Sequence, residues 1–84
     1  MKFYTYILKC ADGSLYTGYT NDLDKRIQAH NEGTASKCTR GRLPVEMIYH
    51  EEFEDKSSAM KREYAIKKMS RKDKLDIIGS LKTK

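Results

Sequence analysis

The alternation of apolar and polar positions predicts three strands. Residues 3–9, FYTYILK, are rich in aromatic and β-branched side chains, which favour a strand. The Asp12-Gly13 pair that follows predicts a hairpin turn, because glycine accepts a positive φ at no steric cost. Residues 15–20, LYTGYT, would form the second arm of this hairpin, and residues 45–53 a third strand.

Helix signals lie between and after these strands. Asn21 or Asp22 can cap a first helix, and Gly33 can end it. Its inward stripe would consist of Leu23, Ile27 and His30, which are spaced at i, i+4 and i+7.

Two further helices are expected in the last third of the chain. Asp55 can cap a helix over residues 56–69, and Ser70 with Asp73 resembles a capping box for a short third helix that ends near Gly79. The resulting order, β-β-α-β-α-α, predicts an α+β fold in which helices flank a small three-stranded antiparallel sheet. We expect one domain over residues 1–84.

Composition narrows the class of protein. The chain has 84 residues, of which 38% are hydrophobic and 35% charged, so we expect a thin core under a strongly solvated surface. Lys and Arg number 17 against 12 Asp and Glu, a net charge of +5. This balance favours a polyanionic partner, because binding to phosphates releases condensed counterions.

Cysteine usage and hydropathy indicate a location. Cys10 and Cys38 lie far apart without a CxxC motif, so we expect free thiols in a reducing compartment and no zinc site. No apolar run approaches membrane-spanning length and no secretory signal is evident. We expect a soluble cytoplasmic protein.

Tyr6 and Tyr16 lie on the two arms of the predicted hairpin. A two-residue loop at 12–13 would place them on opposite faces of the sheet, whereas a three-residue loop over 12–14 would place them on the same face. A bulge near Gly18 would change the register locally. Gly18 could also mark a close approach of the backbone to a ligand.

The two main helices carry polar residues near their inward sides. Arg26 and His30 are four apart on the first helix, with Arg26 at the margin of the buried stripe. On the second helix, Glu63 lies near the middle of an apolar arc that contains Ala59, Met60, Tyr64 and Ile66. A carboxylate there requires an ion-pair partner, either Lys67 or Arg26, or a bound cation.

Several residues are candidates for contact with a nucleic-acid backbone. They are Gly18 in the second strand, Lys37, Arg40 and Arg42 in a polar loop, and Lys67 on the second helix. Loops approach a phosphate backbone easily, so the polar loop is the stronger part of this set.

These features together resemble the GIY-YIG nuclease domain, and in particular its small standalone bacterial members. The resemblance rests on YTYIL at 4–8, YTGYTNDLDKRIQAH at 16–30 and Glu63, and it extends from Tyr4 to about Ile78. It implies a three-stranded antiparallel sheet with flanking helices, and hydrolysis of phosphodiesters assisted by one divalent cation, Mg²⁺ or Mn²⁺.

The resemblance also implies roles for five residues. Tyr16 would be the general base, Tyr6 would position groups by hydrogen bonding, and Arg26 would stabilise charge on the phosphate. Glu63 would hold the cation, and His30 would orient a tyrosine or the water. A free tyrosine has a pKa near 10, so a neighbouring arginine and a metal ion are needed to favour the phenolate.

The chain departs from the family pattern at three places. The first motif reads Tyr4-Thr5-Tyr6 and lacks its Gly-Ile, and Thr17 is the middle residue of the second motif. Larger members have an asparagine about a dozen residues after the metal-binding glutamate, where this chain has Leu75-Asp76.

The leading hypothesis is a divalent-metal-dependent endonuclease acting on DNA rather than RNA, in repair or in the processing of unusual structures. The alternative is a nucleic-acid-binding module that keeps the fold and does not cleave. A third hypothesis is a protein-interaction domain. We expect a monomer or a weak homodimer that does not contact membranes.

Overall fold

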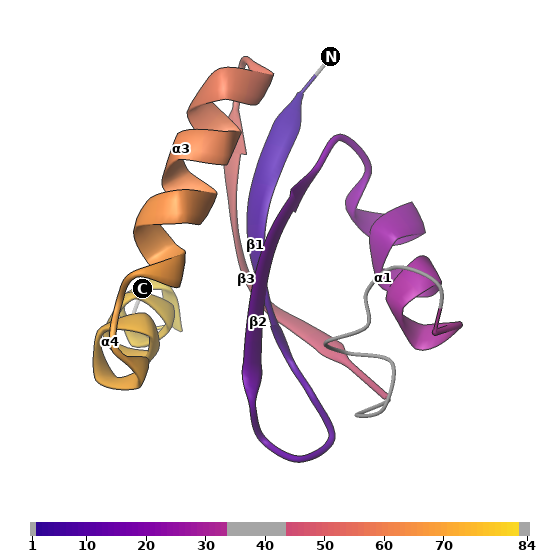
Figure 1. The fold of residues 1–84 in the computed structure, drawn as a ribbon, viewed down its shortest axis with the longest axis vertical. Coiled ribbons are helices and arrows are strands. Elements are labelled where there is room, and N and C mark those ends of the chain that lie inside the picture. Colours follow the sequence, from indigo (N-terminus) through magenta and orange to yellow (C-terminus); the bar gives the residue numbers. More distant parts are fainter. Residues whose placement is uncertain (1, 34–43, 83–84) are drawn as a thin grey trace.

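The computed structural model describes residues 2–33 and 44–82, and it has the predicted α+β order (Figure 1). The strands are β1 (Phe3–Lys9), β2 (Leu15–Thr20) and β3 (Glu46–Phe53), and the helices are α1 (Leu23–Asn31), α3 (Lys56–Lys67) and α4 (Arg71–Lys82). The sheet is antiparallel with the order β2-β1-β3. Three predicted phosphate contacts and one cysteine lie outside the described residues: Lys37, Arg40, Arg42 and Cys38.

Helices cover both faces of the sheet, with α1 on one face and α3 and α4 on the other (Figure 1). The central strand β1 is therefore buried on both sides over residues 5–8. Its even-numbered side chains, Tyr6 and Leu8, pack toward α1, and Ile7 packs with Ile66 and Ile78 of the other two helices. The period of two along β1 thus separates two small cores.

The hairpin turn settles which face the tyrosines share. The loop has three residues, 11–13, because Cys10 N donates to Ser14 O at 2.8 Å and Gly13 has a φ of 86°. Of the two alternatives, the structure therefore has the odd-numbered loop, which lies one residue earlier than the 12–14 loop considered from the sequence. The Asp12 carboxylate accepts from Ser14 N at 3.0 Å, which fixes the turn before Ser14.

The resulting register pairs Tyr6 with Gly18 and Leu8 with Tyr16, so both tyrosines face α1. No bulge interrupts the pairing of β1 with β2 near Gly18. The register shift lies instead between β1 and β3, at Ile7 and Leu8.

The predicted caps are confirmed, whereas two helix ends differ. Asp22 accepts from Lys25 N at the start of α1, and Asp55 accepts from Ser58 N at the start of α3. Ser70 likewise accepts from Asp73 N before α4. Helix α3 ends at Lys67 instead of residue 69.

Helix α4 continues past Gly79 to Lys82. Gly79 does not adopt the positive φ that ends a helix, whereas Gly33 does so after α1, with a φ of 78°.

The buried face of α3 differs from the predicted arc. Ala59 and Ile66 are buried, but Met60 and Tyr64 are 43% and 62% exposed. Thr5 Oγ1 donates to Ala59 O at 2.7 Å, which holds the small Ala59 against the sheet. The helix is thereby rotated so that Met60 and Tyr64 face away from the core. Among the described residues, no helix has the length and apolarity needed to cross a membrane.

Candidate active site

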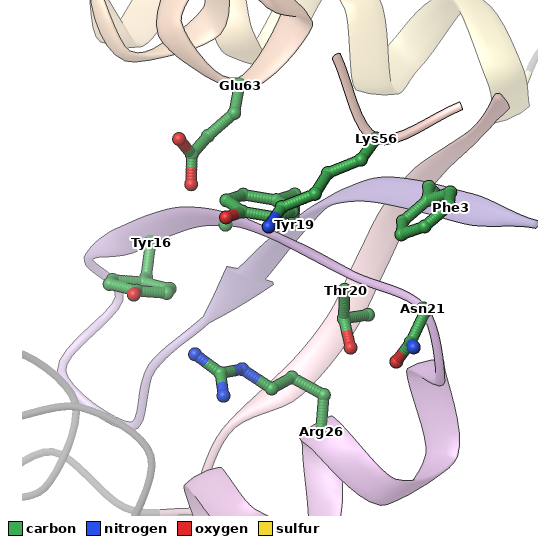
Figure 2. A pocket seen from close by; sticks show the side chains of 9 residues that line it. Phe3, Tyr16, Tyr19, Thr20, Asn21, Arg26, Lys56 and Glu63 are labelled. Carbon is green, nitrogen blue, oxygen red and sulfur yellow. The ribbon is translucent and has the colours of Figure 1, made fainter. Parts of the chain in front are cut away.

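A pocket of about 360 Å³ lies at the outer edge of β2 (Figure 2). Its lining comes from every layer of the fold: Phe3, Tyr16, Gly18, Tyr19, Thr20, Asn21, Arg26, Lys56 and Glu63. Because β2 is an edge strand, side chains from the helices on opposite faces meet beside it without crossing the sheet. Figure 2 shows Glu63 entering from α3 and Arg26 from α1, on opposite sides of the β2 ribbon.

Glu63 is the carboxylate that the sequence placed on an inward face. Its side chain is 19% exposed, and Lys67 Nζ lies 3.6 Å from Glu63 Oε2. Of the two ion-pair partners that the sequence left open, the structure therefore selects Lys67 and not Arg26. The carboxylate still points into the pocket that Tyr16 and Arg26 also line.

The donor set limits which metal site is possible. The described residues contain no group of three or more His, Cys, Asp or Glu side chains that could hold an ion. Mg²⁺ is commonly bound through one or two carboxylates, with water and substrate phosphates as its other ligands. Glu63 fits such an open site and does not fit an all-protein cage.

Tyr6 and His30 form a buried support beneath the pocket and do not line it. The Tyr6 hydroxyl lies 3.1 Å from His30 Nε2, and Arg26 Nε donates to the Tyr6 oxygen at 3.2 Å. Arginine has no acceptor, so the hydroxyl hydrogen of Tyr6 is left for His30 Nε2, which accepts in a neutral imidazole. This network fixes the guanidinium of Arg26 at the mouth of the pocket.

Burial keeps both supporting groups neutral. His30 is 0% and Tyr6 is 1% exposed. Burial, and then the nearby Arg26 charge, lower the pKa of His30 from its usual 6.5. Burial raises the pKa of Tyr6 from its usual 10, and the bond from Arg26 only partly opposes that change. Tyr6 is therefore held as a phenol, which suits a positioning role.

Tyr16 occupies a different environment from Tyr6. It is half-buried, lines the pocket directly and packs against the His30 ring in an edge-to-face arrangement, with the ring centroids 5.1 Å apart. Of the two tyrosines, Tyr16 is thus the one whose hydroxyl can meet a water or a phosphate in the pocket.

Gly18 serves a purpose that the sequence did not predict. A Cβ at this position would lie 2.5 Å from the Tyr6 hydroxyl and 3.2 Å from the Tyr16 ring. The close approach at Gly18 is therefore made by the ring of Tyr6, its partner across the hairpin. Gly18 also forms part of the pocket wall.

Five lining residues were not singled out from the sequence as site residues: Phe3, Tyr19, Thr20, Asn21 and Lys56. Asn21 and Lys56 each lie beside a helix cap, a position that carries no chemical signal by itself. Asn21 places an amide in the pocket wall, whereas Leu75 and Asp76, at the place of the family asparagine, are exposed on α4 and do not line the pocket.

The chain is similar to known proteins over most of its length. A UPF0213 protein of Clostridium perfringens is 60% identical over 92% of this chain and 83% of that relative. A UPF0213 protein of Staphylococcus saprophyticus is 56% identical over 93% of this chain and 95% of that relative.

Two solution NMR structures have the same fold. A protein from E. faecalis has a TM-score of 0.67 and 42% identity, covering 100% of this chain and 90% of that one. A UPF0213 protein from Bacillus halodurans has a TM-score of 0.61 and 46% identity, covering 94% and 84%. The family model described as the GIY-YIG catalytic domain matches residues 2–76. The chain therefore belongs to the GIY-YIG family, as a small member similar to the UPF0213 proteins of bacteria.

Proposed function

We propose that the protein is a divalent-metal-dependent endonuclease that hydrolyses phosphodiester bonds in DNA, with a role in repair or in the processing of unusual DNA structures. The observation that carries this proposal is that Tyr16 of β2, Arg26 of α1 and Glu63 of α3 line one pocket. These side chains supply a proton acceptor, a fixed cation and a carboxylate, which are the groups that phosphodiester hydrolysis requires. The family supports the activity class.

Each side chain has a distinct part in the proposed reaction. Arg26, held by Tyr6, binds the scissile phosphate and stabilises the negative charge that develops on it. Tyr16 accepts a proton from the attacking water. His30 keeps Tyr16 in place through the edge contact of their rings and keeps Tyr6 oriented by hydrogen bonding.

Glu63 would hold Mg²⁺ or Mn²⁺ in the pocket. An ion held there would supply polarisation of the phosphate and would favour ionisation of groups beside it. Glu63 lies in the second half of α3, four residues after the buried Ala59 and three before the buried Ile66, so the packed face of the helix sets its direction.

Basic residues near the pocket provide contacts for the DNA backbone. A groove of about 280 Å³ beside Tyr16 contains Lys67 and Lys74. We propose that these lysines bind phosphates that neighbour the scissile one, and that Lys37, Arg40 and Arg42 extend the same backbone contact. A net charge of +5 supports this role.

The proposal is tested by incubating the protein with single-stranded, duplex and branched DNA in the presence of Mg²⁺ or Mn²⁺. Tyr16→Phe and Glu63→Gln should each lower the rate by about 100-fold or more. Tyr4→Phe and Glu46→Gln are matched controls at residues that do not line the pocket, and they should leave the rate unchanged. Cleavage that survives both site substitutions would show that the pocket is not the active site.

One observation favours a second candidate, a DNA-binding module that does not cleave. The Lys67–Glu63 ion pair gives the carboxylate a partner without any metal. This candidate predicts salt-dependent DNA binding, no cleavage with either ion, and no effect of Glu63→Gln on binding.

A further inference from the structure

The outer side of α3 carries a groove that the cores do not use. It measures about 600 Å³ and is lined by Lys56, Ser57, Met60, Lys61 and Tyr64. We call it the α3 groove. Met60 and Tyr64 are among the large apolar side chains that this small protein leaves exposed. Adjacent exposed apolar side chains of this kind mark interaction surfaces.

We propose that the α3 groove binds an unpaired nucleotide of the DNA strand that enters the active-site pocket, with its base stacked on the ring of Tyr64. The inference rests on the proposed nuclease function and adds to it the kind of substrate: DNA with a single-stranded segment beside the cleaved bond.

The α3 groove and the active-site pocket share one lining residue and lie on neighbouring parts of α3. Lys56 lines both, and Met60 lies one helical turn before Glu63, so that the two are neighbours on the surface of α3. Figure 2 shows Lys56 reaching across the pocket beside Tyr19, while Glu63 enters from the same helix. A strand with one phosphate in the pocket can therefore continue along α3 without crossing another element.

The charges around the groove fit a nucleic-acid strand. Lys68 Nζ lies over one face of the Tyr64 ring, 4.3 Å from its centroid, so a base would stack on the opposite face of this 62% exposed residue. Lys56 and Lys61 form no ion pair with a carboxylate in the part of the chain that the structure describes, so their charges are available for phosphates. Lysines beside an exposed aromatic ring are the combination that single-strand-binding grooves use.

The exposed ring selects an unpaired base. In a duplex, each base is covered above and below by its neighbours, so the Tyr64 ring can stack only on a base that has left the helix. Stacking of this kind tolerates any base, because every base has an aromatic face. An acidic peptide would also be attracted by the lysines, but the shared boundary with a phosphate-binding pocket favours nucleic acid.

Binding without metal tests the inference separately from cleavage. A fluorescein-labelled single-stranded oligonucleotide and a duplex of the same sequence are titrated in EDTA at several salt concentrations. Tyr64→Ala should weaken single-strand binding by about ten-fold or more and leave duplex binding almost unchanged, whereas Tyr64→Phe should keep the ring and the affinity. Leu75→Ala, at another exposed apolar residue that lies outside the groove, is the matched control.

The dependence on salt separates stacking from charge. Tyr64→Ala should lower the affinity at every salt concentration without changing the slope of log K against log salt. Lys61→Gln should make that slope shallower by about 0.7, which corresponds to one phosphate contact on a single strand.

The inference is overturned if Tyr64→Ala binds the single strand as the wild type does, or if it loses single-strand and duplex binding equally. A protein that stacks a base on Tyr64 but cuts nothing with Mg²⁺ or Mn²⁺ would refute the nuclease proposal alone. One that cuts without needing Tyr64 would refute the α3 groove alone.

Discussion

Gly18→Ala is the substitution whose effect follows most directly from the coordinates. The added Cβ would lie 2.5 Å from the Tyr6 oxygen and 2.7 Å from Tyr6 Cζ, distances that real Cβ atoms do not tolerate. The ring of Tyr6 must move, yet it is 1% exposed and its hydroxyl is bonded to both Arg26 and His30. The substitution therefore disturbs the whole support beneath the pocket.

The expected loss of unfolding free energy is the loss that extra atoms cause in a packed core. Extra methyl groups in well-packed sites cost about 1–3 kcal/mol of unfolding free energy. For a chain of this size, each kcal/mol corresponds to about 4–8 °C in Tm. Gly18 does not adopt a positive φ, so backbone strain adds nothing and the loss is steric. We expect Tm to fall by about 4 °C at least, and the cleavage rate to fall further than Tm alone explains, because Arg26 loses its fixed position.

Gly79→Ala is the matched control for this substitution. Nothing lies within 4 Å of a Cβ at Gly79, and the residue is inside α4. Alanine is favoured over glycine in a helix by about 1 kcal/mol, so this variant should unfold at the wild-type temperature or above it. Thermal unfolding followed by circular dichroism gives both values. A Gly18→Ala protein as stable as Gly79→Ala would refute the packing of Tyr6 against Gly18.

Three further predictions concern the groups around the pocket. Tyr6→Phe removes the oxygen that Arg26 and His30 share, and urea unfolding should show a loss of about 1–3 kcal/mol; no loss would contradict the network. The folded pKa of His30 lies below its unfolded value near 6.5, so between these two pKa values the unfolded chain binds more protons than the folded protein. The free energy of unfolding should therefore fall as the pH decreases through this range, and it should level off below the folded pKa. His30→Gln should remove this part of the pH dependence in urea titrations at pH 5–7, and an unchanged slope would refute it. Lys67→Gln removes the ammonium group that pairs with Glu63. The Mg²⁺ concentration for half-maximal cleavage should then fall about two-fold, which corresponds to the free energy of an i,i+4 ion pair. A rise in that concentration would show that Lys67 supports the metal site instead.

Much of the fold could be predicted because local signals and global packing agree. The caps Asp22, Asp55 and Ser70 have short-range causes that a sequence displays directly. The position of the hairpin loop could not be predicted, because two- and three-residue loops both suit an Asp-Gly pair. The Asx turn around Asp12 selects the odd loop and thereby the shared face of the tyrosines.

The site was predictable in kind but not in its arrangement. The sequence placed Glu63 inward, yet its arc included Met60 and Tyr64, because periodicity cannot fix the rotation of a helix to within one residue. That rotation depends on the contact of Ala59 with β1, which is a tertiary contact. The same contact exposes Tyr64, so the feature that the sequence assigned to the core becomes the proposed binding surface.

A double-mutant cycle on the single-turnover cleavage rate tests the central claim most directly, because it asks whether Tyr16 and Glu63 act in one site. The rates of the wild type, Tyr16→Phe, Glu63→Gln and the double variant are measured with saturating Mg²⁺ or Mn²⁺. Residues that act as a unit are strongly non-additive, so the double variant should be little slower than the slower single variant. Losses that multiply, or a double variant that still cleaves at the wild-type rate, would contradict the proposed active site.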